Sequence, residues 1–87
     1  MELSIIGSGT MGIGIAHACA KKNHKVFIVD SSAECLKSGK EKLFKLLDKL
    51  VQKGKYSKQD KKEITTNLNF TDDLGKIKNS DFVIEAI

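Results

Sequence analysis

Leu-Ser-Ile-Ile-Gly-Ser-Gly-Thr-Met-Gly, residues 3–12, is the stretch of this sequence that decides the fold. It opens with a short, mainly apolar run that a glycine ends, which is typical of a buried β-strand. Gly7, Gly9 and Gly12 then follow at GxGxxG spacing, and small and apolar residues recur at helical spacing from Ile13 to Lys22. The predicted order is therefore strand, glycine turn and helix.

The three glycines have the residue type and the context that a phosphate-binding loop needs. Gly7 permits the tight turn after the strand, and Gly9 lets the backbone approach a pyrophosphate. Gly12 lets the helix pack closely on the sheet, so that the free N–H groups at its N-terminus can hold the phosphate charge. The sequence therefore predicts a dinucleotide-binding loop, and a glycine turn without a ligand is the competing interpretation.

Asp30 indicates which dinucleotide the loop would hold. It follows the β-branched and aromatic run Val26–Val29 and lies eighteen residues beyond Gly12. A carboxylate there accepts hydrogen bonds from the ribose hydroxyls of NAD and repels a 2′-phosphate, for which NADP-binding proteins use arginine. The chain contains no arginine, so we expect NAD. NADP is the alternative, because Ser31 and Ser32 offer hydroxyls to a phosphate, and a helix-capping acid is the other interpretation of Asp30.

The segment between the second and third strands is predicted to form two helices. Ser31 or Ser32 can cap the first, which ends near residue 54, and Ser57 with Asp60 resembles the cap of a short second helix to about residue 66. One face of the long helix carries five leucines, Leu36, Leu43, Leu46, Leu47 and Leu50. An adjacent face carries four lysines, Lys42, Lys45, Lys49 and Lys53.

Four strands are expected, at about residues 2–6, 25–29, 67–70 and 81–86. Strands that alternate with helices form a parallel sheet with right-handed crossovers, so the fold class is α/β, a Rossmann-type parallel sheet with helical crossovers. A complete dinucleotide-binding fold has about six strands. Residues 1–87 are therefore expected to be an incomplete N-terminal portion of that domain, truncated after about four strands, with the last strand as an unpaired edge.

Composition bounds the class of protein. At 87 residues the chain is at most one domain, and 40% hydrophobic with 30% charged residues fits a folded globular chain. The net charge of +4 comes from lysine alone, whereas nucleic-acid-binding proteins rely on arginine for guanine and phosphate, so no nucleic-acid partner is expected. No apolar run approaches the ~18–20 residues of a membrane helix, so no membrane partner is expected either.

The two cysteines, Cys19 and Cys35, are sixteen residues apart and show no CxxC pattern. We expect them to be reduced, partly buried thiols, not a disulfide or a metal site. The predicted location is therefore cytoplasmic.

Gly-Ser-Gly-Thr-Met-Gly-Ile-Gly-Ile-Ala at residues 7–16, together with Val29-Asp30, resembles the N-terminal domain of the 3-hydroxyacyl-CoA dehydrogenases, most closely the bacterial 3-hydroxybutyryl-CoA dehydrogenases. The lysine-rich helix and residues 69–74 and 81–87 agree with the same family. Its members oxidise the 3-hydroxyl of an acyl-CoA with hydride transfer to NAD. The resemblance therefore implies the NAD-binding fragment of such an enzyme, in fatty acid and butanoate metabolism.

The resemblance implies cofactor positions residue by residue. The pyrophosphate loop is matched by six residues, Gly7, Ser8, Gly9, Thr10, Met11 and Gly12. Asp30 matches the acid that binds the ribose. Ala86 and Ile87 match the end of the fourth strand, where the family's backbone passes the adenosine side of NAD.

Substrate contacts are expected to be few. Lys53, and less closely Lys49 or Lys55, matches the family region that meets the phosphates of coenzyme A. A solvated lysine face is the competing interpretation of these three residues, and the favoured one.

No catalytic residue is assigned within the chain. The family's catalytic histidine and its partner glutamate lie beyond the fourth strand, and a helical C-terminal domain completes the site and forms a homodimer. His17 in the first helix and His24 before the second strand match neither position and are expected to be structural. The chain alone is therefore expected to be inactive.

Two other functions stay open from the sequence. One is a free-standing NAD-binding module without catalysis. The other is a fragment of the 6-phosphogluconate or 3-hydroxyisobutyrate dehydrogenase group, which shares a glycine loop followed by Met-Gly. Those enzymes pass from the second strand to the third without the lysine-rich helical pair.

Overall fold

Strands and helices alternate along the chain in the computed structural model, which describes residues 1–86. Ile87, one of the expected cofactor positions, lies outside the described residues. The elements in chain order are β1 (Glu2–Ile6), α1 (Thr10–Lys21), β2 (Lys25–Val29), α2 (Ala33–Gln52), α3 (Lys58–Thr66), β3 (Leu68–Thr71), the 3₁₀-helix η1 (Leu74–Asn79) and β4 (Phe82–Glu85). The four expected strands and the helical pair between β2 and β3 are confirmed.

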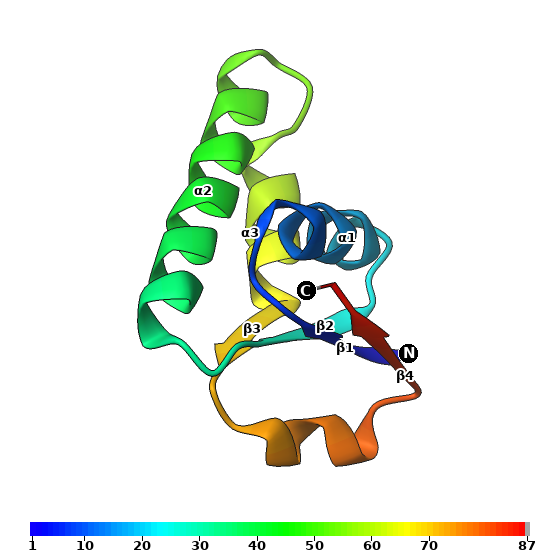
Figure 1. Ribbon diagram of the computed structural model, residues 1–87. Helices are drawn as coiled ribbons and strands as arrows, with labels where there is room; N and C mark the ends of the chain where they lie inside the picture. Colours follow the sequence, from blue (N-terminus) through cyan, green and yellow to red (C-terminus); the bar gives the residue numbers. More distant parts are fainter. Residues whose placement is uncertain (87) are drawn as a thin grey trace.

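The four strands form one parallel sheet in the order β3-β2-β1-β4. Figure 1 shows α1, α2 and α3 over one face of this sheet and η1 beside the other. This is the expected Rossmann-like α/β arrangement. Because all strands are parallel, the carboxyl ends of β1, β2 and β4 meet at one edge, and the loops that follow them lie together there.

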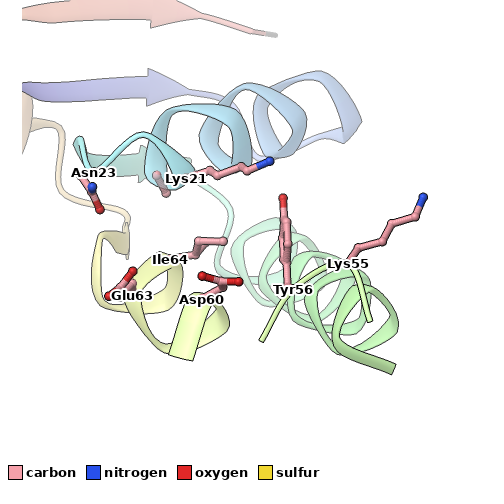
Figure 2. A pocket seen from close by; sticks show the side chains of 8 residues that line it. Lys21, Asn23, Lys55, Tyr56, Asp60, Glu63 and Ile64 are labelled. Atoms are coloured by element: carbon pink, nitrogen blue, oxygen red, sulfur yellow. The ribbon is translucent and has the colours of Figure 1, made fainter. Parts of the chain in front are cut away.

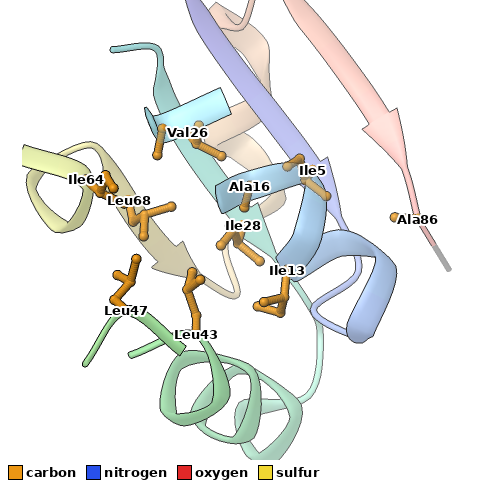
Figure 3. Packing of buried hydrophobic residues seen from close by; sticks show 11 residues of the cluster. Ile5, Ile13, Ala16, Val26, Ile28, Leu43, Leu47, Ile64, Leu68 and Ala86 are labelled. Carbon is orange, nitrogen blue, oxygen red and sulfur yellow. The ribbon is translucent and has the colours of Figure 1, made fainter. Parts of the chain in front are cut away.

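The core lies between the helices and the covered face of the sheet. Ile5 of β1 and Val26 and Ile28 of β2 are fully buried, as are Leu43 and Leu47 of α2. Figure 3 shows these side chains converging with residues of α1, α3 and β3, namely Ile13, Ala16, Ile64 and Leu68. The core is thin, and α1, α2 and α3 all contribute side chains to it.

Three details differ from the sequence-based expectations. Leu46, expected on the apolar face of α2, is 40% exposed, because Leu43 and Leu47 one turn apart fill the narrow seam and Leu46 lies on its flank. Cys35, expected to be partly buried, is exposed. The first helix begins at Thr10 instead of Ile13, since the N–H of Ile13 already donates to the carbonyl of Gly9.

Both predicted helix caps of the helical pair are present. The hydroxyl of Ser32 accepts the N–H of Cys35 at the start of α2. At the start of α3, Ser57 and Asp60 form a reciprocal capping box, each side chain accepting the backbone N–H of the other. These caps fix where each helix begins.

Within residues 1–86, no helix is long and apolar enough to cross a membrane.

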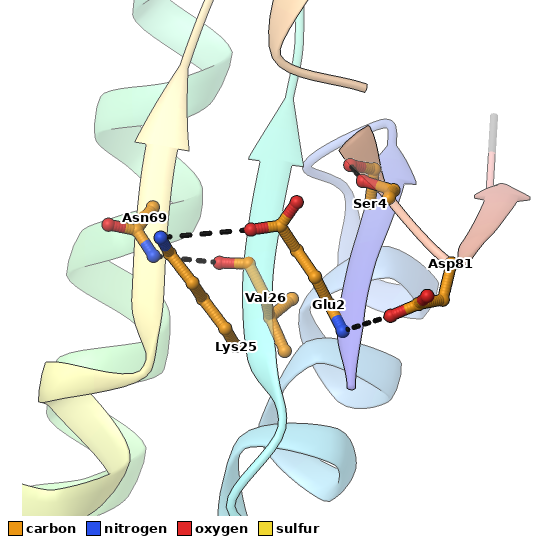
Figure 4. Close-up of polar contacts among 7 residues, drawn as sticks. Glu2, Ser4, Lys25, Val26, Asn69 and Asp81 are labelled. Carbon is orange, nitrogen blue, oxygen red and sulfur yellow. Dashed lines mark hydrogen bonds and ion pairs between the residues drawn. The ribbon is translucent and has the colours of Figure 1, made fainter. Parts of the chain in front are cut away.

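Polar contacts hold the segment from the end of η1 to β4 against β1, at the edge of the sheet opposite β3. The N–H of Glu2 donates to Oδ2 of Asp81 at 2.8 Å (Figure 4), and the hydroxyls of Ser4 and Ser80 are in contact. Within residues 1–86, β4 pairs with β1 alone, and Phe82 is 58% exposed. Strand β4 is therefore an edge strand whose pairing depends on β1.

Candidate functional site

A recess of about 330 Å³ opens where β1, β2 and β4 end. We call it the loop recess, and its lining residues are Ile6, Gly7, Ser8, Gly9, Val29, Asp30, Ser31 and Ala86. In open parallel sheets, ligands bind outside the carboxyl ends of the strands. The structure thus brings together most of the cofactor positions that the sequence indicated.

The glycine loop has the backbone geometry of a ligand cradle. Gly7 has φ +113°, which side-chain-bearing residues rarely adopt, and its N–H donates to the carbonyl of Val29 at 2.8 Å. A Cβ on Gly12 would lie 2.1 Å from the carbonyl oxygen of Gly7, so only glycine lets α1 begin directly on the loop. A Cβ on Gly9 would meet nothing within 4 Å. The space over Gly9 is therefore open to a ligand, whereas Gly7 and Gly12 are required by the fold itself.

The N-terminus of α1 points its free donors toward this loop. Gly9 occupies the N-cap without a side chain that could accept a hydrogen bond, and the first turn carries no acidic residue. The first N–H groups of a helix have no partner within the helix and carry a partial positive charge. This end of α1 therefore suits a phosphate, as the glycine spacing predicted.

Asp30 is fixed in place by three hydrogen bonds. The backbone N–H of Ser8 and its hydroxyl both donate to Oδ2, at 3.1 and 2.8 Å, and the N–H of Ser32 donates to Oδ1 at 3.0 Å. The Ser32 N–H, and after it the Ser8 hydroxyl, hold the pKa of Asp30 below its ordinary value. The carboxylate is thus ionised, and Oδ1 keeps capacity to accept a further donor such as a ribose hydroxyl.

Asp30 is not the N-cap of the following helix, because Ser32 takes that position. The interpretation of Asp30 as only a capping acid therefore loses its main support.

A second recess of about 350 Å³ lies beside the first and shares three of its residues. We call it the α2 recess, and it is lined by Ser8, Gly9, Asp30, Glu34, Cys35, Ser38 and Lys42. The sequence reasoning missed the last four of these residues. Helical spacing could have indicated three of them as a group, since Glu34, Ser38 and Lys42 recur every four residues and so lie on one face of α2.

Helix α2 can lie this close to the loop because of Gly39. A Cβ there would lie 2.7 Å from the carbonyl oxygen of Ser8. Gly39 is buried, and it therefore sets the distance between α2 and the loop that carries Ser8.

The structure leaves four expected residues outside both recesses, namely Thr10, Met11, Gly12 and Lys53. Thr10 and Met11 begin α1 with exposed side chains. Lys53 caps the C-terminal end of α2, a helix of 20 residues. At a rise of about 1.5 Å per residue, Lys53 lies roughly 30 Å along the helix from Ser32.

A third cavity, of about 210 Å³, lies near that far end, between α1, the α2–α3 turn and α3 (Figure 2). His17 lies near it and bonds through Nε2 to the hydroxyl of Tyr56 at 2.9 Å. Burial, and after it the nearby Lys21 ammonium, holds the pKa of His17 below its ordinary value of 6.5. Neither recess at the strand ends is lined by a histidine. Among residues 1–86, no group of three or more His, Cys, Asp or Glu side chains could hold a metal ion.

Comparison with known proteins gives consistent matches along the chain. The family model described as 3-hydroxyacyl-CoA dehydrogenase, NAD binding domain, matches residues 2–87. A 3-hydroxybutyryl-CoA dehydrogenase of Clostridioides difficile is 38% identical over 86 residues, which are 99% of this chain and 31% of the relative. The alpha subunit of the fatty acid oxidation complex of Psychrobacter cryohalolentis is 34% identical, over 99% of this chain and 12% of the relative.

Solved structures agree with these relatives. The (S)-3-hydroxybutyryl-CoA dehydrogenase of Ralstonia eutropha superposes with a TM-score of 0.93 at 35% identity, over 98% of this chain and 30% of that protein. A 3-hydroxybutyryl-CoA dehydrogenase of Escherichia coli gives a TM-score of 0.94 at 33% identity, over 98% of this chain and 18% of that protein. The chain thus spans about a third or less of the proteins that it matches.

Proposed function

Because this chain belongs to the 3-hydroxyacyl-CoA dehydrogenase family, whose NAD-binding domain model matches residues 2–87, we propose that it binds the ADP half of NAD in the loop recess. The observation that carries the proposal is Asp30, an ionised carboxylate fixed by three hydrogen bonds at the mouth of a glycine-lined recess. A rigid acceptor at this point suits a ribose diol better than it suits a capping role.

Each group of the recess has one task in this proposal. Oδ1 of Asp30 accepts a ribose hydroxyl, and Ser8 holds the carboxylate still. The backbone of Gly9 and the first N–H groups of α1, from Thr10 to Gly12, hold the pyrophosphate. Ala86 closes the adenosine side of the recess. NAD, when bound, supplies the hydride acceptor for the reaction.

The whole protein's reaction is proposed to be oxidation of the 3-hydroxyl of an acyl-CoA, with 3-hydroxybutyryl-CoA as the specific substrate class. Relatives that carry this name cover the chain almost completely, which supports the proposal. Hydride transfer needs a general base beside the substrate hydroxyl. Neither recess contains a histidine, so we propose that the base lies outside residues 1–87 and that this chain alone binds NAD without catalysis.

The remaining parts of the proposal concern partners and location. The parent is proposed to be a cytoplasmic homodimer, and the two free cysteines support a reducing compartment. Lys53 is proposed to meet a phosphate of coenzyme A, with Lys49 and Lys55 beside it; all three are exposed, so a solvated lysine face remains the simpler description. The 6-phosphogluconate and 3-hydroxyisobutyrate alternative is not carried further, because the family model matches residues 2–87.

Titration of the ¹⁵N-labelled chain with NAD and with NADP tests the binding proposal. The wild type is expected to bind NAD more tightly than NADP, with shifts at residues of the loop recess. Asp30→Asn removes a charged acceptor, and such hydrogen bonds contribute about 1.5–3 kcal/mol, so NAD binding should weaken about ten-fold or more.

Glu63→Gln is the matched control, since it removes one exposed charge on α3 that lines neither recess. Its dissociation constants should equal those of the wild type. Equal affinity of the wild type for both dinucleotides, or unchanged NAD binding by Asp30→Asn, would contradict the proposal.

A further inference from the structure

The α2 recess combines Asp30, which binds the ribose in the proposed function, with three charged or dipolar groups that NAD binding does not use. Asp30 and Glu34 carry negative charge, Lys42 carries positive charge, and the N-terminus of α2 itself opens there with Ser32 as its cap. A helix N-terminus is equivalent to roughly +0.5 of an elementary charge. The recess is therefore a place where attraction and repulsion of an anion are closely balanced.

Asp30 stands at the boundary between the two recesses, because it lines both. Its Oδ2 is occupied by Ser8, and the free capacity lies on Oδ1, next to the Ser32 N–H at the start of α2. A ribose hydroxyl accepted at Oδ1 is therefore close to the α2 recess. A phosphate attached to that hydroxyl has the roughly 350 Å³ of this recess to enter, so space does not exclude it.

Charge must then decide whether a 2′-phosphate is accepted. Without Glu34, the ammonium of Lys42 and the helix N-terminus would outweigh the single charge of Asp30, and Ser38 would add a hydroxyl donor. With Glu34 ionised, the sum changes sign and becomes repulsive. The acid in the first turn of α2 thus has an effect that Asp30 cannot have alone.

On the basis of the proposed NAD binding, we propose that Glu34 is a second specificity-determining residue, which acts with Asp30 to exclude dinucleotides that carry a 2′-phosphate. Lys42 is the cation that would hold this phosphate once the charge of Glu34 is removed. The inference deepens the proposed function, since it explains how a chain with a lysine-lined helix beside its ribose acid still prefers NAD.

The test compares dissociation constants of NAD and NADP for the wild-type chain and Glu34→Gln at low salt. Glu34→Gln should bind NADP about three- to ten-fold more tightly and NAD within two-fold of the wild type, as expected for one screened charge at several ångströms from a phosphate. In Glu34→Gln/Lys42→Gln the gain for NADP should disappear. Raising the salt concentration should shrink the gain as well.

Glu63→Gln again serves as the matched control and should leave both constants unchanged, because Glu63 lines neither recess. Glu34 is exposed, so the neutral variant should keep the folded spectrum of the wild type. NAD binding by the wild type together with unchanged NADP affinity in Glu34→Gln overturns this inference alone. Failure of both proteins to bind either dinucleotide overturns the proposed function and this inference with it.

Discussion

Ser8 is the residue that joins the two halves of the candidate site. It is 4% exposed, and its hydroxyl and N–H both donate to Oδ2 of Asp30, across a sequence separation of 22 residues. Its carbonyl oxygen faces Gly39 of α2. One small residue therefore couples the loop after β1, the end of β2 and the helix that follows, through its hydroxyl and its backbone.

Ser8→Ala is predicted to raise the pKa of Asp30 toward its ordinary value, because the Ser8 hydroxyl is one of the groups that lower it. A carboxyl whose pKa is lowered by folding adds stability above its unfolded pKa of about 4, and this stability is lost as the pH falls through the folded pKa. The variant should therefore lose about 1 kcal/mol at pH 7 and lose less than the wild type on going to pH 3. Carboxyl NMR titration and urea unfolding at the two pH values measure this, and an unchanged pKa of Asp30 would refute it.

The identity of Ser8 as the partner of Asp30 could not be predicted from the sequence. The GxGxxG spacing fixes the glycines by backbone geometry, and it leaves the residue between the first two glycines free. Asp30 itself could be predicted, because its place at the end of β2 follows from local pattern. The hydrogen bond between them depends on how the loop and β2 meet in space.

At the scale of elements, local rules predicted nearly every helix and strand, because caps, apolar runs and glycine turns act over a few residues. The capping box of Ser57 and Asp60 is an example. Contacts between elements were harder to predict from the sequence. The α2 recess exists because α2 crosses the glycine loop at Gly39. Helical spacing places Glu34, Ser38 and Lys42 on one face of α2, but it does not indicate that this face meets the glycine loop.

Gly39→Ala is predicted to destabilise the chain although alanine favours a helix by about 1 kcal/mol over glycine. The added Cβ would lie 2.7 Å from the carbonyl oxygen of Ser8, and such overpacking costs about 1–3 kcal/mol. We expect a net loss of roughly 1 kcal/mol. Gly14→Ala in α1 is the control, because its Cβ meets nothing within 4 Å and should stabilise by about 0.5–1 kcal/mol. Equal effects of the two variants in urea unfolding would disprove the packing argument.

The contact between α1 and the α2–α3 turn should make stability depend on pH. His17 has a lowered pKa in the folded chain, so below about pH 6.5 the unfolded chain binds more protons than the folded one. Stability contributed by neutral His17 is therefore complete above pH 6.5 and is lost as the pH falls toward the folded pKa. In His17→Gln the loss between pH 7.5 and pH 5 should be smaller, measured as urea midpoints. If His17→Gln loses as much stability between these pH values as the wild type does, the prediction is contradicted. His24→Gln is the control for replacing a histidine elsewhere in the chain.

At the scale of the whole molecule, the parallel sheet follows from the alternation of elements, whereas the strand order is a matter of long-range pairing. Strand β1 lies between β2 and β4, so it pairs with the next strand in the sequence and with the last one described. The pattern of each strand is compatible with several neighbours. The three helices on one face of the sheet, and η1 on the other, follow once that order is given (Figure 1).

The position of β4 also has a consequence for the order of folding. Leu3 pairs with Val26, which is close to it in the sequence, and with Phe82, which is separated from it by nearly the whole chain. Closing the longer loop costs about 1 kcal/mol more in chain entropy, and distant pairings form late. We therefore expect the β1–β2 pair with α1 to form first and β4 to dock last among the described elements. Ala86 lines the loop recess and should take its place when β4 docks. The recess is then complete only at the last step, so nucleotide binding measured during refolding should report that step and not the first.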